Sequence, residues 1–560
     1  MKKKLMPLAV GAAIAASSAQ AQMYINNEGT GEMLVFPFYS AEAGNTTNVN
    51  VVNTTDVAKA VKIRIIEGEN SQEVLDFNVY MSARDHFSFA IAATEEGGGS
   101  LVTNDNTCTV PQLTAGEAVP FRGILYANDK GEDNKATEDK DESFDNTGIE
   151  RTAVGYIEVI EMGQLNMAKA NWDVKTDPAG DKTPESISPM LAAITHGADG
   201  VPADCTLPVA AWSSGGAWAE DAADNAGTDG AAGVGETFMG VTWNGGGLYG
   251  QASVVNVADA TAFGEDAVAI ESAVDTSVAT VSYGGAQLHY PPGDTRPDFT
   301  SDGVNTSSTV AVDGEIYDMS WTDYDDDASL VAVTSVFQTQ EIMNDYVTDP
   351  GIAASTDWII THPTKFQHIN AYVADVGTVG DKDYEEGTET LEPFSVPWDG
   401  QEACEYAGFE NWDREEATPL VIPDVPDFSP APEVPKEYYD LPLCYEVNVV
   451  VFGDTSAVKN ESLDIGVGPQ LEDNDGWAKI SLAYGDLSTA PLGGAAATVN
   501  DHERFITDDD GQALSGLPVT GFAVQTYTNG SVNGSGNVAN YAASLEHKTS
   551  AAGSDLGFDG

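Results

Sequence analysis

Two histidines and a lysine fall within residues 358–368 of a chain that has only seven histidines. Histidine and lysine serve as bases and nucleophiles, and histidine also binds metals. His362 and His368 are six positions apart, an even spacing that puts both on one face of a continuous strand. Pro363 interrupts such a strand because it fixes φ and removes a backbone donor. With no carboxylate between the histidines, the spacing favours a strand end with packed or exposed histidines over a zinc or catalytic site.

Common catalytic motifs are absent from the sequence. It has no Gly-x-Ser-x-Gly elbow, no His-Glu-x-x-His, no P-loop and no Gly-x-Gly-x-x-Gly unit between a strand and a helix. Glycoside hydrolysis needs only two carboxylates about 5 to 9 Å apart, and 89 acidic residues give no basis for choosing them. Glu158 and Glu161, on one expected strand, face opposite sides. We therefore assign no catalytic or cofactor-binding residue and favour a non-enzymatic role.

The amino terminus has the pattern of a secretory signal peptide. Three lysines at residues 2–4 precede an apolar run at 5–16 and a small-x-small cleavage pattern at 19–21. No later segment approaches the roughly 20 apolar residues of a spanning helix, so we expect no transmembrane segment in the mature chain. The sequence predicts a signal peptide at 1–21 and a secreted protein of the cell surface or extracellular space, with the periplasm left open.

The formal net charge of −65 bears on partners. So acidic a surface disfavours nucleic acid and anionic lipid. It suits a protein from a saline habitat, and it leaves self-association and surface glycans as partners to consider. With 42% hydrophobic residues the chain can bury substantial cores, and its length predicts two or more domains.

The four cysteines, Cys108, Cys205, Cys404 and Cys444, include no Cys-x-x-Cys pair. An even number in an exported chain predicts two disulfides, although four cysteines allow three pairings. Cys108 and Cys205 share the context Cys-Thr-x-Pro, so we favour a bond between them and a second between Cys404 and Cys444. A zinc site is disfavoured because the paired spacing is missing.

Alternating apolar and polar residues predict strands. Residues 61–65 and 75–81 alternate around a turn-like segment, which predicts a hairpin with one buried side. The pattern recurs at 445–449, 477–484 and 522–527, and we expect a further strand at 156–162. Helical signals are few, at 188–194 and 341–346, and residues 258–273 fit either a helix or a strand. The predicted fold is all-β, with two antiparallel β-sandwich-like domains, long acidic loops and a few short helices.

Polar insertions and one proline-rich stretch divide the chain. The insertions, which we expect to be surface loops, are residues 128–148, 219–235, 374–390 and 412–439. The strand pattern breaks around the proline-rich segment 291–297 and the Ser/Thr/Asp run after it. We therefore predict an N-terminal domain at 22–295 and a C-terminal domain at 296–560.

Acidic turns and tryptophans are the remaining binding candidates. Asp323, Asp325 and Asp327 place oxygens at alternate positions, a weak calcium signal, because no complete twelve-residue calcium loop is present. Three tryptophans beside Gly-rich loops would serve as a carbohydrate platform if exposed and would pack if buried: Trp212, Trp218 and Trp243. Calcium is the one cofactor that the pattern leaves open.

Several segments resemble a group of exported β-rich proteins of Gram-negative bacteria for which no activity is known. They include Val-Val-Asn-Thr-Thr at 51–55, Glu-Val-Leu-Asp-Phe-Asn-Val-Tyr at 73–80, Gly-Tyr-Ile-Glu-Val-Ile-Glu-Met at 155–162, Thr-Asp-Trp-Ile-Ile-Thr-His-Pro-Thr-Lys at 356–365 and Gly-Leu-Pro-Val-Thr-Gly-Phe-Ala at 516–523. The resemblance implies export and a β-rich architecture, and it carries over no functional residue. We expect a disulfide-stabilised structural or adhesive protein, with a carbohydrate-binding protein or polysaccharide hydrolase, or a calcium-dependent module, as alternatives.

Overall fold

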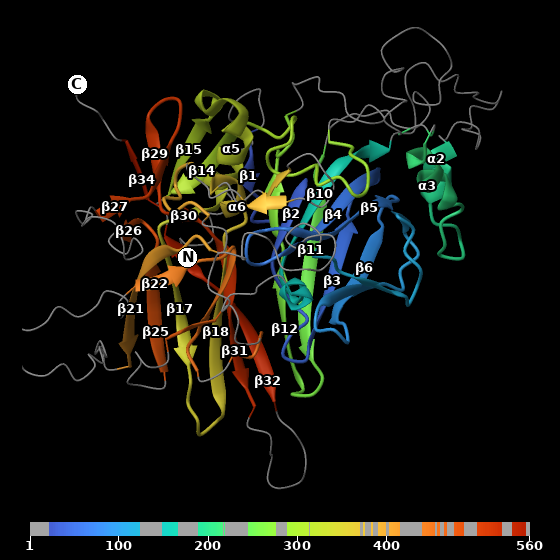
Figure 1. The fold of residues 1–560 in the computed structure, drawn as a ribbon. Helices are drawn as coiled ribbons and strands as arrows, with labels where there is room; N and C mark the ends of the chain where they lie inside the picture. Colours follow the sequence, from blue (N-terminus) through green and yellow to red (C-terminus); the bar gives the residue numbers. More distant parts are fainter. Residues whose placement is uncertain are drawn as a thin grey trace, which may run out of the picture.

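The computed structural model places strands over most of the described chain (Figure 1). It describes residues 22–123, 148–165, 189–214, 216, 218, 245–275, 288–312, 314–369, 373–375, 382–384, 390–398, 402–414, 440–453, 456–459, 464–467, 475–486, 501–528, 540–550 and 552–555. The expected signal peptide and most of the polar insertions lie outside these ranges. None of the described helices is long and apolar enough to cross a membrane. The all-β prediction is confirmed.

Two sheets from residues 24–271 form the N-terminal sandwich. The first sheet, in spatial order, is β1 (Tyr24–Ile25), β13 (Val268–Glu271), β2 (Met33–Ser40), β10 (Val154–Leu165), β4 (Ala58–Glu67), β5 (Glu73–Met81) and β8 (Cys108–Val110). The second is β12 (Thr261–Asp266), β11 (Leu248–Asn256), β3 (Asn45–Asn53), β6 (His86–Ala93), β7 (Gly99–Val102) and β9 (Ala118–Pro120). All pairs in both sheets are antiparallel.

The predicted hairpin is β4 with β5, in the register Val61 to Val79 and Ile63 to Phe77. These side chains are buried between the two sheets. Full burial of such an apolar side chain contributes about 1.5–3 kcal/mol, so the alternation fixes which face of the hairpin points inward.

The expectation of one buried side is wrong, because every residue of β4 is buried. On the second face, Lys62 Nζ donates to Asp76 Oδ2 at 2.6 Å and to the carbonyls of Pro291 and Asp294 at 2.8 Å. A segment some 230 positions away therefore covers this face. The alternating pattern identified the polar side chains on this face of the hairpin. It could not show that a distant segment of the chain packs over them.

Two further sheets, from residues 341–550, form the C-terminal sandwich. One is β22 (Asp440–Leu443), β21 (Glu405–Asp413), β25 (Asp475–Ser481), β17 (Glu341–Val347) and β33 (Lys548–Ser550). The other is β24 (Asp464–Gly466), β23 (Val447–Val451), β18 (Ala354–Thr361), β31 (Thr520–Tyr527) and β32 (Tyr541–Glu546). Within these two sheets only β23 and β24 pair in parallel.

Short elements complete the fold. The helices are α2 (Pro189–Ile194), α3 (Thr206–Trp212), α5 (Ala328–Phe337) and α6 (Lys365–His368), with 3-10 turns η2 (Ile149–Ala153) and η6 (Thr322–Asp327). The small strands are β14 (Ser307–Val312), β15 (Glu315–Ser320), β16 (Gln338–Thr339), β19 (Val373–Asp375), β20 (Lys382–Tyr384), β26 (Tyr484–Asp486), β27 (Asp501–Glu503), β28 (Phe505–Thr507), β29 (Gln512–Ser515), β30 (Leu517–Pro518) and β34 (Ala552–Asp555).

The helix expected at 188–194 corresponds to α2, whereas the one expected at 341–346 is wrong. That segment is β17, which pairs with β25 and β33. Ile342 and Tyr346, both buried, are four positions apart, a spacing that fits one face of a helix or one face of a strand. Pairing with neighbouring strands decides between the two.

The two sandwiches share a continuous apolar layer. The outer face of the first sheet contributes Val35 and Tyr156, and the facing sheet of the C-terminal sandwich contributes Val449 and Phe522. Figure 1 shows the resulting stack of four sheets, with the N-terminal sandwich on the right and the C-terminal one on the left. The described sheets therefore pack as one body, and the predicted division at 295/296 stays a prediction.

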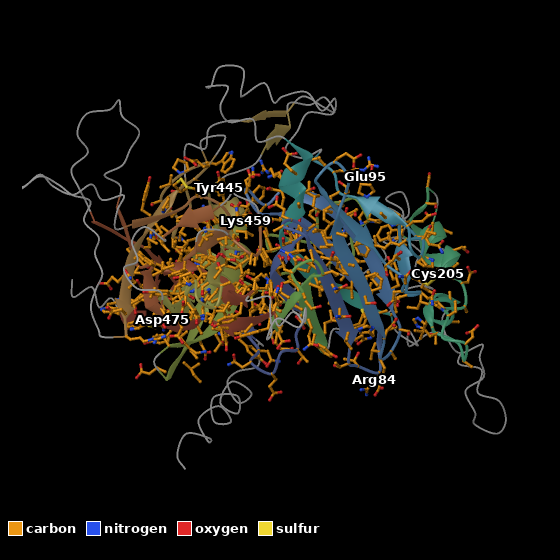
Figure 2. The ribbon with its side chains drawn as sticks, turned by 90° about the horizontal axis from the view of Figure 1, so that it is seen from below. Arg84, Glu95, Cys205, Tyr445, Lys459 and Asp475 are labelled. Atoms are coloured by element: carbon orange, nitrogen blue, oxygen red, sulfur yellow. A yellow bond between two sulfur atoms is a disulfide. The ribbon has the colours of Figure 1, made fainter. Side chains whose placement is uncertain are left out.

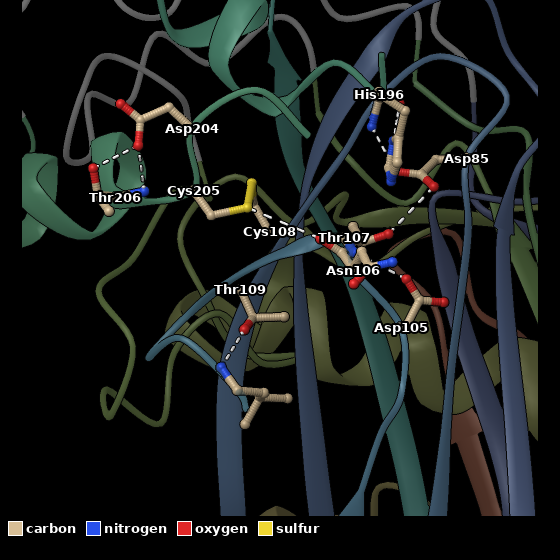
Figure 3. Close-up of a disulfide and its surroundings, with 12 residues drawn as sticks. Asp85, Asp105, Asn106, Thr107, Cys108, Thr109, His196, Asp204, Cys205 and Thr206 are labelled. Carbon is tan, nitrogen blue, oxygen red and sulfur yellow. Dashed lines mark hydrogen bonds and ion pairs between the residues drawn. A yellow bond between two sulfur atoms is a disulfide. The ribbon is translucent and has the colours of Figure 1, made fainter. Parts of the chain in front are cut away.

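Two disulfides join Cys108 to Cys205 and Cys404 to Cys444, the pairing favoured from the sequence. Cys108 begins β8, and Cys205 directly precedes α3 (Figure 3). The first bond closes a separation of 97 residues and ties the α2–α3 region to the sheet. The second closes 40 residues and links the start of β21 to the chain just after β22.

Candidate functional site

The histidine-containing stretch lies where the two sandwiches meet. Strand β18 ends at Thr361, whose hydroxyl donates to the carbonyl of Pro37 in the N-terminal sandwich at 2.7 Å. The Tyr156 hydroxyl donates to the carbonyl of Pro363 at 3.4 Å. The expected strand end at residue 361 is confirmed, and the turn after it points into the interior.

We call His362, Lys365, His368, Glu405, Glu446 and Arg504 the junction cluster. All six residues are at most 1% exposed. The sequence pointed to the two histidines and the lysine of this set, whereas the two acids and the arginine were missed. Glu405 begins β21, Glu446 directly precedes β23, and Arg504 lies between β27 and β28. Glu446 lies in the strand expected at 445–449, but the observed strand β23 begins only at Val447, and Glu446 is buried in the bend before it.

Both histidines of the cluster are uncharged. His362 Nδ1 lies 2.8 Å from the carbonyl of Pro518, so it carries the proton and donates. His368 Nδ1 faces the carbonyl of Leu391, and His368 Nε2 accepts from Thr334 Oγ1 at 2.7 Å. Burial lowers the pKa of His362 to about 3 and that of His368 to about 4. Both rings are therefore neutral at physiological pH.

Lys365 and Glu446 have pKa values shifted in opposite directions by burial. The Lys365 ammonium donates to the carbonyls of Leu443 and Tyr445, and burial lowers its pKa to about 8. Neither carboxylate oxygen of Glu446 accepts a hydrogen bond from another described residue. Burial raises the pKa of Glu446 well above its usual value of 4.5. A lysine and an acid perturbed in this way are a common pattern in acid–base sites.

Arg504 and Glu405 form the fixed part of the cluster. Arg504 Nη2 lies 2.8 Å from Glu405 Oε2, and each side chain is 1% exposed. Arg504 also donates to the carbonyls of Leu482 and Tyr406, and Glu405 accepts from two further backbone amides. This pair is fully hydrogen-bonded, as a buried ion pair must be to persist.

The junction cluster differs from an active site because its side chains are buried away from any substrate. General acid–base catalysis requires the group to reach a substrate proton within about 3 Å, and none of the six side chains meets solvent or lines the cavity described next. The arrangement supplies perturbed groups without an approach for a substrate. We read it as a polar core that fixes the two sandwiches against each other.

A cavity of about 710 Å³ lies between the sandwiches. Tyr24 and Glu265 line it from the N-terminal sandwich, and Phe522 and His547 from the C-terminal one. Burial raises the pKa of Glu265 well above its usual value and lowers that of His547 to about 4. The volume suits a small ligand, and the acidic residues Asp266 and Glu546 also line the walls.

The three aspartates considered for calcium, Asp323, Asp325 and Asp327, are exposed on η6. Their carboxylates do not form a close group of three ligands. Within the described ranges, the only such grouping is Glu402 with Cys404 and Cys444, whose sulfurs are bonded to each other. The calcium prediction therefore gains no geometric support and stays a prediction.

The described tryptophans that were considered as a carbohydrate platform pack against other side chains instead. Trp218 is fully buried and stacks on Tyr80 at 5.2 Å, and Trp212 Nε1 donates to the Tyr80 hydroxyl. These two tryptophans pack, which was the alternative for them, and Trp243 lies outside the described residues. A tryptophan pair that the sequence analysis missed is the exposed Trp477 with the half-buried Trp412. The signal was available, because Trp477 alternates with the buried Ala478 and so belongs to the polar face.

Comparisons with known proteins return no relative. No family model, curated protein or solved structure matches the chain. The resemblance to exported β-rich proteins therefore stays an expectation, and the functional argument depends on the geometry alone.

Proposed function

We propose that the protein is exported to the cell surface or extracellular matrix and acts there as a structural or adhesive protein. One observation carries this proposal. The groups capable of acid–base chemistry, such as Lys365 and Glu446, are sealed between the sandwiches, whereas aromatic side chains such as Trp477 and Tyr541 face solvent. Such a molecule offers surfaces for contact, with its reactive groups held inside.

Three further features fit an extracellular structural role. Both disulfides tie loops or chain segments to sheets, and disulfides persist in oxidising compartments. The described sheets stack on a shared apolar layer, which gives a rigid body able to transmit force between its two ends. The high negative charge keeps such a protein soluble in salt.

Imaging the purified mature protein by negative-stain electron microscopy, with and without added calcium, tests the structural part of the proposal. We expect fibres, sheets or clustered particles, more ordered with calcium if the acidic loops bridge copies. Uniform single particles in both conditions would remove the structural role and leave adhesion to a different partner. Defined catalytic turnover on a substrate panel would contradict the proposal as a whole.

A further inference from the structure

A stacked tryptophan pair, one ring exposed and one half-buried, lies on the outer face of the C-terminal sandwich. Trp412 on β21 and Trp477 on β25 are cross-strand partners, with ring centroids 4.2 Å apart and planes 16° apart. Ala478 and Ile480 alternate with Trp477 and are buried between the sheets, so Trp477 points outward, and it is 39% exposed. Figure 2 shows Asp475, at the start of β25, on the side of the molecule opposite Cys205.

A second aromatic pair lies at the same end of this sandwich. Tyr527 and Tyr541 are cross-strand partners on β31 and β32, stacked at 4.5 Å, and Tyr541 is 56% exposed. Tyr527 pairs with Ala354, the first residue of β18, and Trp477 pairs with Asp345, close to the last residue of β17. Both pairs therefore lie where β17 passes into β18. We call Trp412, Trp477, Tyr527 and Tyr541 the aromatic end.

Polar groups surround the tryptophans. The exposed Asp345 is the register partner of Trp477 on the neighbouring strand. In the next row, Lys479 Nζ bridges Glu410 at 2.8 Å and Glu341 at 3.3 Å. A protein-docking patch has an apolar core depleted of charged residues, whereas here a stacked pair of rings lies beside carboxylates. A sugar ring matches this pattern, because its C–H face covers an aromatic ring while its hydroxyls donate to nearby carboxylates.

Charge narrows the class of polymer. Single-stranded nucleic acids also stack on aromatic side chains, but they and acidic polysaccharides are anionic. Beside the tryptophans, Arg414 contacts Asp475, and Lys479 is held by two acids, so the local cations are already paired. With a net charge of −65 on the whole chain, anionic polymers are repelled.

We propose that the aromatic end binds a neutral polysaccharide, with Trp477 and Tyr541 stacking on sugar rings and Asp345 accepting hydrogen bonds from hydroxyls. The inference rests on the proposed function, since it names the material to which an adhesive protein would attach. Strand pairing holds the rings in place before binding, so little side-chain freedom is lost when a sugar arrives.

The test is affinity electrophoresis of the full mature protein through gels that contain one polysaccharide each: β-glucan, xyloglucan, mannan, dextran, alginate or chitosan. Retardation by at least one neutral polymer is expected. Trp477→Ala should weaken it about tenfold or more, as loss of a central aromatic contact does, and Trp477→Phe should retain part of it. Val201→Ala, which alters an exposed apolar residue of the N-terminal part, serves as the control and should leave binding unchanged.

The other outcomes overturn the inference. Retardation by chitosan alone, lost in about 0.5 M salt where charges are screened within a few ångströms, would show that the acidic surface attracts a polycation and that the aromatic rings do not bind sugar. Equal binding by Trp477→Ala and the unaltered protein, with equal unfolding midpoints, would place the sugar elsewhere. Retardation by no polymer, in a protein that still assembles in electron micrographs, would remove this inference and leave the proposed function standing.

Discussion

Arg64 on β4 and Glu158 on β10 are register partners and form a buried ion pair, with side chains 8% and 2% exposed. Arg64 also binds Glu73 on β5 at 2.8 Å, so one guanidinium ties three neighbouring strands. Burial raises the pKa of Glu158 to about 7 even beside this cation. The pair belongs to the polar face of the hairpin that the sequence revealed only in part.

Replacing Arg64 by methionine should destabilise the fold by about 3–5 kcal/mol, because two buried carboxylates lose their cation. Glu158→Gln should cost less, since Arg64 keeps Glu73. Chemical denaturation gives the free energies of unfolding. Asp56→Asn, in the exposed pair of Asp56 with Arg84, is the matched control and should change nothing measurable. Equal effects of Arg64→Met and Asp56→Asn would show that the buried network is not structural.

His362→Asn should reduce the acid sensitivity of the fold. Folding lowers the pKa of His362 from 6.5 to about 3, so below pH 6.5 the unfolded chain takes up a proton that the folded chain does not. The stabilisation by neutral His362 is therefore full above pH 6.5 and is lost as the pH falls toward 3, by about 1.4 kcal/mol per pH unit. Asparagine keeps a donor for the Pro518 carbonyl. Unfolding at pH 7, 6 and 5 measures the slope, and His86→Asn, at an exposed position, should leave the slope unaltered.

Removing either disulfide should lower stability through the unfolded chain. The chain-entropy model gives about 4 kcal/mol for loops of this size, and more for the longer loop. The double variant Cys108→Ser/Cys205→Ser, which opens a separation of 97 residues, should therefore be less stable than Cys404→Ser/Cys444→Ser, which opens 40. Denaturation with and without reductant checks this. A reductant that leaves the unaltered protein's midpoint unchanged would contradict it.

Period-two patterns predicted the strands because inward-facing side chains such as Ile63 and Val79 must be apolar. They failed for α5, whose apolar run, including Val331 and Val333, is rich in β-branched residues and entirely buried. A helix buried on all sides has no polar stripe to show its period. The residues that pack around α5 favour the helix here, and they come from distant parts of the sequence.

The candidate sites show the same limit. His362 and Lys365 stood out by type, yet their partners, such as Glu446 in the bend before β23, come from some eighty residues later in the chain. The register of β21 with β25 brings Trp412 beside Trp477, and no local pattern contains that register. Sequence spacing identifies which face a residue occupies, and the sheet order decides what lies opposite.

Attachment of beads coated with the folded mature protein tests the central claim most directly. The beads should clump with one another or adhere to cell-derived matrix, and beads coated with reduced, unfolded protein should do neither. Folded-protein beads that stay dispersed and bind no matrix above the unfolded control would contradict a structural or adhesive role.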